Sequence, residues 1–266
     1  MKNNIFGIIF ASLGELPGYG SVAFLCGGYV AYTFKYSKKT IWKILLTIMS
    51  VVFFMGVVYF MGGAFVSING FGALNYEAIH RDIIKYPAGF LLLAPFATFG
   101  FILVNKTENK DIIYAMVVLS VVLFISMLFC PLVKPLFHRP RFRYLVEGGY
   151  ELYHPWYKPF KEYATFDNFG DNEAFVSFPS GHIGTTMGFV LSLYFLPLFV
   201  PKLKGKELLL MTIGFCYTLF LAFTRIFVAA HFLSDVSFSG LIVLLFCFIG
   251  VNIYDKIAIK KNIVME

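Results

Sequence analysis

The sequence predicts an all-α fold of the kind found in polytopic helical membrane proteins. Of its 266 residues, 59% are hydrophobic and 14% are charged, against roughly 45–50% apolar and about 25% charged residues in a soluble domain. The mean hydropathy is +0.76, and an aqueous core could not hide this much apolar surface. Lipid must therefore solvate much of the chain, which argues against a soluble globular enzyme.

Seven stretches are long and apolar enough to be membrane-spanning helices, since a helix needs roughly 20 apolar residues to cross about 30 Å of hydrocarbon. The seven stretches are 18–34, 41–67, 88–104, 112–133, 183–200, 207–230 and 236–254. We expect the last six to form a six-helix domain over residues 41–254, with the first as an extra N-terminal span.

The N-terminal hydrophobic segment, residues 1–40, has two interpretations. Residues 5–13 are too few to cross a bilayer, so one expectation is an interfacial piece followed by the 18–34 span. The alternative is a re-entrant hairpin over residues 1–34. Because more apolar sequence follows at once, we expect no signal-peptide cleavage here.

Lysines gather in the short links between the apolar stretches, and membrane topology explains them better than nucleic-acid binding does. They are Lys35, Lys38, Lys39, Lys106, Lys110, Lys202, Lys204, Lys206, Lys256, Lys260 and Lys261. By the positive-inside rule this face is cytoplasmic, including the tail 255–266. The link 68–87 and the polar stretch 134–182 then lie on the outer face of the plasma membrane.

Three polar clusters fall at outer helix ends, where costly charges indicate function. They are KPLFHRPR at 134–141, FPSGH at 178–182 and TRIFVAAHFLSD at 224–235. Three cations, Lys134, Arg141 and Arg225, can neutralise phosphate oxygens. His182 and His231 can supply proton transfer or a nucleophile.

The spacing within the first and third clusters limits the backbone conformations that can bring their side chains together. Lys134 and Arg141 share one face of a helix, about 10 Å apart, and Pro135 predicts that this helix is kinked. His231 and Asp235 stand at i and i+4, so a carboxylate can fix the imidazole tautomer. Arg225 precedes His231 by about 240° of helix, so both can face one ligand only if the helix breaks between them or the arginine reaches across.

The second cluster predicts a turn followed by a helix. Pro179 and Gly181 bracket Ser180 and expose backbone N–H groups, and the N-terminus of the following helix attracts anions. His182 lies in the first turn of that helix, where it can donate a proton to a leaving group.

In order and spacing, the clusters resemble the type 2 phosphatidic acid phosphatase (PAP2) superfamily of membrane phosphatases, whose pattern is KxxxxxxRP, then PSGH, then SRxxxxxHxxxD. The matching residues are Lys134, Arg141, Pro179, Ser180, Gly181, His182, Arg225, His231 and Asp235. Two positions depart from the pattern, because Phe142 replaces a proline and Thr224 replaces a serine.

The resemblance implies a metal-independent, two-step hydrolysis of a lipid phosphate without a cofactor. It makes His231 the nucleophile that forms a phosphohistidine, Asp235 the residue that orients it, and His182 the acid for the leaving group. It assigns phosphate binding to Lys134, Arg141, Ser180, Gly181 and Arg225. A metal is not expected, since no third ligand accompanies His231 and Asp235.

The sequence leaves the substrate and the fate of the phosphoryl group open. Undecaprenyl diphosphate, phosphatidate and phosphatidylglycerol phosphate are the candidate substrates. Alternatives to hydrolysis are phosphotransfer to a second lipid and a non-catalytic phosphate-binding protein or transporter. Membrane lipids are the expected surroundings, with no nucleic-acid partner, and the sequence identifies no protein partner.

Several polar residues stay outside the predicted site. Arg139 and Arg143 match no catalytic position and are interpreted as headgroup ligands or interface anchors. His80, His138 and His154 are interpreted as structural histidines. The loop 144–178 is rich in aromatic residues and either caps the site or packs without touching substrate. The four cysteines, Cys26, Cys130, Cys216 and Cys247, are predicted to be buried apolar side chains.

Overall fold

The protein is all-helical over the residues that its computed structural model describes: 4–67, 69–74, 78–148, 153, 155–158 and 174–261, with the side chains of 73, 74, 78–82, 147 and 148 outside this description. The elements are α1 (Ile5–Leu13), α2 (Leu16–Tyr36), α3 (Thr40–Val66), η1 (Phe71–Leu74), α4 (Ala78–Lys106), α5 (Ile112–Phe137), α6 (Phe142–Gly148), α7 (Gly181–Met187), α8 (Phe189–Phe199), η4 (Pro201–Leu203), α9 (Glu207–Phe227) and α10 (Leu233–Lys260).

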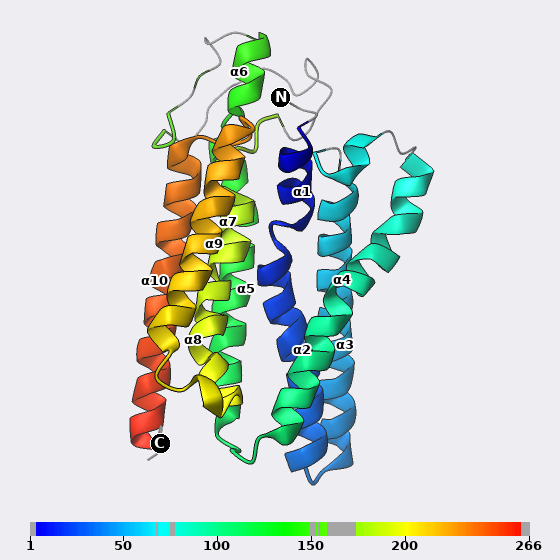
Figure 1. Cartoon of the computed structure of the whole chain (residues 1–266), viewed down its shortest axis with the longest axis vertical. Coiled ribbons are helices and arrows are strands. Elements are labelled where there is room, and N and C mark those ends of the chain that lie inside the picture. The colour runs from blue at the N-terminus through cyan, green and yellow to red at the C-terminus, as the bar shows by residue number, and fades with distance from the viewer. Residues whose placement is uncertain are drawn as a thin grey trace.

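Within the described residues, seven helical segments are long and apolar enough to cross a membrane, which confirms the predicted number of spans and the all-α class. Figure 1 shows them side by side, with the N-terminus and α6 at one end and the C-terminus at the other. The chain is a multi-pass membrane protein. Several boundaries differ from the prediction by part of a helix, and α10 continues to Lys260, which takes half of the predicted tail into the helix.

The N-terminal segment is a single broken helix instead of a hairpin. α1 ends at Leu13 and α2 begins at Leu16, and Gly14 and Glu15 between them keep right-handed helical backbone angles. The two helices therefore run in the same direction and form one 32-residue candidate span. Pro17 stands in the first turn of α2, where a missing N–H costs no hydrogen bond.

Glycines allow α4 to touch both α2 and α3 backbone to backbone. A Cβ placed on Gly27 would lie 1.8 Å from the Ala97 carbonyl oxygen, and one on Gly100 would lie 2.0 Å from the Phe24 carbonyl oxygen. A Cβ on Gly62 of α3 would lie 1.9 Å from a carbonyl oxygen of α4. This is how helices associate in lipid, where small residues let backbones approach closely.

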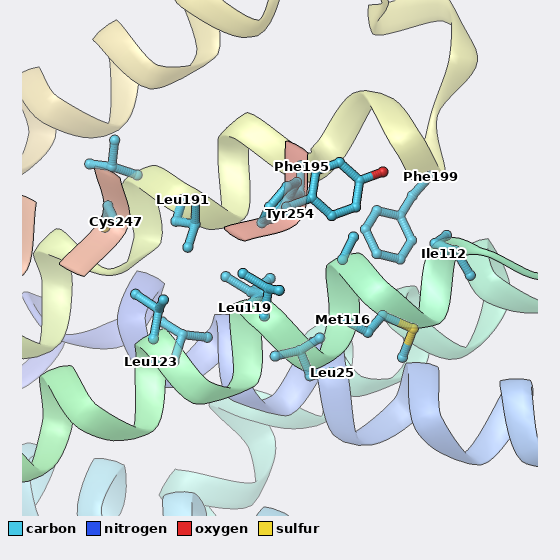
Figure 2. Packing of buried hydrophobic residues seen from close by; sticks show 14 of the residues in the cluster. Leu25, Ile112, Met116, Leu119, Leu123, Leu191, Phe195, Phe199, Cys247 and Tyr254 are labelled. Atoms are coloured by element: carbon cyan, nitrogen blue, oxygen red, sulfur yellow. The ribbon is translucent and has the colours of Figure 1, made fainter. Parts of the chain in front are cut away.

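The largest buried cluster joins the N-terminal segment to the C-terminal helices. Figure 2 shows Leu25 of α2 facing Leu119 of α5, with Leu191 of α8 and Cys247 of α10 completing the packing. The cluster holds α5 against the helices that carry the polar motifs. Cys26, Cys130 and Cys247 are buried as predicted, but Cys216 is exposed on α9, because its position faces outward from the bundle.

Candidate active site

The first polar cluster lies where α5 ends, not on a continuous helix. Pro131 and Pro135 lie inside α5, and the helix stops at Phe137 because His138 adopts a left-handed conformation with φ 38°. Arg141 follows in a non-helical segment, held by its N–H at 2.9 Å from the Ala174 carbonyl oxygen. The predicted kinked helix over 134–141 is therefore wrong in its second half, since the helix ends at Phe137 and residues 138–141 are not helical.

The second cluster forms the N-terminus of α7, as its turn residues predict. Ser180 is the N-cap of α7, and its N–H donates to the Asp235 carbonyl oxygen at 3.2 Å, which joins the second cluster to the third. A Cβ on Gly181 would lie 3.5 Å from the Lys134 ammonium nitrogen. The lysine of the first cluster therefore reaches the helix N-terminus of the second.

The third cluster contains a helix break between Arg225 and His231, which is one of the two arrangements that their spacing allows. α9 ends at Phe227 and α10 begins at Leu233, and Ala229 between them has a left-handed φ of 56°. The backbone N–H of His231 donates to the Arg225 carbonyl oxygen at 3.3 Å. This turn places both side chains inside the bundle, where Arg225 is 3% and His231 is 3% exposed.

His231 is held as a single tautomer by a backbone carbonyl group. Its Nδ1 lies 2.7 Å from the Ser177 carbonyl oxygen and 3.7 Å from Asp235 Oδ2. A carbonyl oxygen only accepts hydrogen bonds, so Nδ1 carries the proton and Nε2 keeps its lone pair. The predicted carboxylate near the ring is present, but the hydrogen bond at Nδ1 goes to Ser177.

Asp235 is fixed by three donors. The Arg139 guanidinium forms a buried ion pair with Oδ1, the Ser177 hydroxyl donates to Oδ2, and the Phe232 N–H donates to Oδ2 at 2.9 Å. Ser177 thus contacts the carboxylate with its side chain and His231 with its backbone. Ser177 therefore links the carboxylate to the imidazole, in addition to the direct approach of 3.7 Å between Asp235 Oδ2 and His231 Nδ1.

Arg139 and Ser177 are the two site residues that the sequence analysis missed. Arg139 is 2% exposed, donates to the Ser234 hydroxyl at 2.6 Å, and lies 3.9 Å from the centre of the Phe232 ring. Its interpretation as a headgroup ligand is wrong, because a buried guanidinium that pairs with Asp235 does not reach lipid. The signal available in the sequence was its position between the motif residues Lys134 and Arg141, directly before Pro140.

Burial away from water lowers the pKa of His231 to about 4, with the positive charges of Arg141 and Lys134 acting in the same direction and Asp235 opposing them. The imidazole is therefore neutral at physiological pH. A neutral imidazole with a free Nε2 lone pair is the form that can attack phosphorus.

Unpaired polar atoms converge beside this histidine. Among the residues that the structure describes, Ser180 Oγ, His182 Nε2 and Arg225 Nε are buried without a hydrogen-bond partner. Buried polar groups are normally satisfied, so this cluster of cations and spare donors is suited to a tetrahedral oxyanion.

A comparison with models of protein families identifies the family to which these motifs belong. The model of the PAP2 superfamily matches residues 115–258, which include every motif residue described above. The chain belongs to the PAP2 superfamily. Membership supports a phosphatase that acts on phosphate esters. A comparison with curated proteins and one with solved structures gave no match.

The residues at the two positions that depart from the PAP2 pattern, Phe142 and Thr224, each make contacts within the protein. Phe142 occupies the first position of α6, where proline is favoured because its φ suits a helix start, and its ring packs edge-on against Phe232 at 5.7 Å. Thr224 is fully buried and its hydroxyl donates to the Leu221 carbonyl oxygen at 2.7 Å. Both positions keep a structural role next to the site.

The remaining candidates fall outside the PAP2 motif positions. Arg143 donates to Asn69 Oδ1 at 2.8 Å and so ties α6 to the 68–87 link. The side chain of His80, the whole of His154 and most of the 144–178 loop lie outside the described residues. At the edges of that loop, Trp156 packs against Phe178 at 5.9 Å. No group of three His, Cys, Asp or Glu side chains suited to a metal occurs in the described part.

Proposed function

We propose that this PAP2 protein hydrolyses a lipid phosphate or diphosphate at the outer face of the plasma membrane through a phosphohistidine. The observation that carries the proposal is the hydrogen bond from His231 Nδ1 to the Ser177 carbonyl oxygen at 2.7 Å. It leaves Nε2 as the nucleophilic atom beside a cluster of cations and unpaired donors.

The first step exchanges one bond at phosphorus. Nε2 of His231 attacks the phosphorus atom, and the bond to the lipid oxygen breaks. His182 gives its proton to that oxygen, which releases a lipid alcohol from a monoester or a lipid monophosphate from a diphosphate. Lys134, Arg141 and Arg225 stabilise the charge that develops on the phosphoryl oxygens.

The second step returns the enzyme to its starting state. Water attacks the phosphohistidine, the P–N bond breaks, and phosphate leaves. The proton of the attacking water returns to His182. No step requires a metal or a cofactor, because the side chains supply the nucleophile, the acid and the charge neutralisation.

The distribution of lysines supports the outer face as the location of the site. The lysine-rich links lie between α2 and α3, between α4 and α5, between α8 and α9, and at the end of α10. The site lies at the opposite end of the bundle, where α5 ends and α7 begins. By the positive-inside rule the lysine-rich end is cytoplasmic.

The experiment is phosphate release by the purified protein in detergent with EDTA. Undecaprenyl diphosphate, phosphatidate and phosphatidylglycerol phosphate are tested side by side, with His231→Asn as the inactive variant. We expect release by the wild type that EDTA does not reduce and that the variant lacks. The fastest substrate then identifies the lipid class.

The alternatives give different products. Transfer of the phosphoryl group to a second lipid without free phosphate would indicate a phosphotransferase. Phosphate binding by the wild type and by His231→Asn, with no covalent intermediate in either, would indicate a binding protein or transporter. Loss of release in EDTA, restored by a divalent cation, would contradict the metal-independent mechanism.

A further inference from the structure

One acidic side chain reaches the cationic site from outside the matched family region. Glu15 lies at the break between α1 and α2 and is only 9% exposed. An ionisable residue inside a membrane segment is costly and is by default a functional candidate. The proposed mechanism gives Glu15 no role.

Contacts between the helix break and α7 fix the position of Glu15. The Gly14 carbonyl oxygen accepts from the Thr186 hydroxyl at 3.2 Å and from the Tyr217 hydroxyl at 3.1 Å. A Cβ on Gly18 would lie 2.4 Å from the Thr185 carbonyl oxygen. The residues on both sides of Glu15 therefore lie directly against the helix that begins with the PSGH motif.

Glu15 lies against α7 about one helical turn from the glycine that Lys134 approaches. Its neighbours Gly14 and Gly18 contact Thr186 and Thr185 of that helix. Thr185 and Gly181 stand at i and i+4 on the same face of α7, and Gly181 lies beside the Lys134 ammonium group. Glu15 accordingly acts electrostatically on Lys134 and on Arg225.

The N-terminal segment also touches Arg225 directly. The Arg225 Nη2 donates to the Gly7 carbonyl oxygen at 3.2 Å. A Cβ on Gly7 would lie 2.6 Å from a methyl carbon of Val228, in the turn that precedes His231. Arg225 is thus in contact with residues 5–15, while Lys134 lies beside Gly181, one turn of α7 from the residues that pack on the helix break.

We propose that Glu15 is an internal counter-ion that competes with bound phosphate for Lys134 and Arg225 and so weakens the affinity of the site for phosphate anions. This inference rests on the proposed function, in which those two cations bind the phosphoryl group. A site with excess positive charge retains the phosphate product, and the negative charge of Glu15 beside the site favours release of that phosphate. One unit charge about 10 Å away, at an effective dielectric constant of about 20, changes the affinity for a singly charged anion about tenfold and that for a dianion by more.

The test measures anion binding separately from activity. Tungstate, a tetrahedral dianion of phosphate-like shape, is titrated calorimetrically at pH 8 into the purified full chain in detergent. Glu15→Gln and Glu15→Met remove the charge, Glu15→Asp keeps it, and Glu108→Gln removes an equal charge at the other end of the bundle. Phosphate release from phosphatidate and undecaprenyl diphosphate is measured on the same preparations.

Both neutral variants at Glu15 should bind tungstate at least about tenfold more tightly than the wild type, whereas Glu15→Asp and Glu108→Gln should stay within about twofold. A gain in affinity is diagnostic, because damage to the fold weakens binding. Unchanged or weaker binding by the folded neutral variants would overturn the inference. An inactive wild type with tighter-binding neutral variants would instead refute the proposed function and leave the counter-ion in place.

Discussion

Residues 5–106 and residues 112–260 pack their helices in different ways. In the first region, glycines such as Gly27 and Gly62 bring the backbones of α2, α3 and α4 into contact, and no buried ion pair is found among its described residues. In the second region, Arg139 and Asp235 are both buried as charges, and Ser180 and His182 keep unpaired polar atoms.

The difference separates stability from function. Backbone contacts through glycine gain van der Waals packing without burying a charge. Buried charges and unpaired donors cost free energy, so they persist where the site needs them. Glu15 is the exception in the first region, and it lies at the point where that region touches the site.

The largest effect is expected for a side chain at the glycine contact between α2 and α4. Gly27→Leu would force a Cβ to 1.8 Å from the Ala97 carbonyl oxygen, which the two backbones can relieve only by separating. We expect no folded protein by size-exclusion chromatography in detergent. Gly56→Leu is the control, because a Cβ there meets nothing within 4 Å. Equal yields of both variants would show that these glycines do not hold the region together.

Breaking the buried ion pair comes next. Arg139→Met leaves Asp235 uncompensated, which costs about 3–5 kcal/mol in comparable buried pairs. We expect a lower thermal unfolding temperature and slower phosphate release, with kcat reduced more than KM, because Arg139 does not touch the substrate. Arg139→Lys should restore part of the unfolding temperature and part of the rate of phosphate release. An Arg139→Met protein with wild-type kcat would contradict its role in positioning Asp235.

The pH dependence of stability tests the environment of His231. In the unfolded chain this histidine takes up a proton near pH 6.5, but in the folded protein only near pH 4. Protons therefore favour the unfolded state between these values, and this contribution to stability is lost as pH falls. Relative to His231→Asn, the wild type should lose about 1.4 kcal/mol per pH unit between pH 6 and pH 4. If the free energies of unfolding of the wild type and of His231→Asn changed in parallel with pH over this range, His231 would not be buried as a neutral base.

The smallest effect is expected at the lysine-rich end. Lys35 pairs with Glu108 at 3.3 Å, and the glutamate side chain is 91% exposed. Exposed pairs contribute about 0–1 kcal/mol, so Glu108→Gln should leave unfolding temperature and phosphate release almost unchanged. Lys35→Met should cost more, because the Lys35 ammonium group also donates to the carbonyl oxygens of Asn105 and Thr107. Equal effects would mean that the two carbonyl contacts add nothing.

The sequence by itself determined the helical membrane class, the number of spans and the motif residues. The length of an apolar stretch fixes whether a helix can cross lipid, and residue type with spacing identifies Lys134, His182 or His231 as chemistry-bearing groups. Helical geometry left two arrangements open for Arg225 and His231, a helix break or an arginine that reaches across, and the structure shows the break.

Only the tertiary structure decided which atoms meet. The bond from His231 to Ser177 and the pair between Arg139 and Asp235 join residues 54 and 96 positions apart, and no local pattern specifies such contacts. The course of residues 5–36 was equally open, since an apolar stretch interrupted by Gly14 and Pro17 suits a hairpin as well as a broken helix. The packing of that break against α7 settled its direction and placed Glu15 beneath the site.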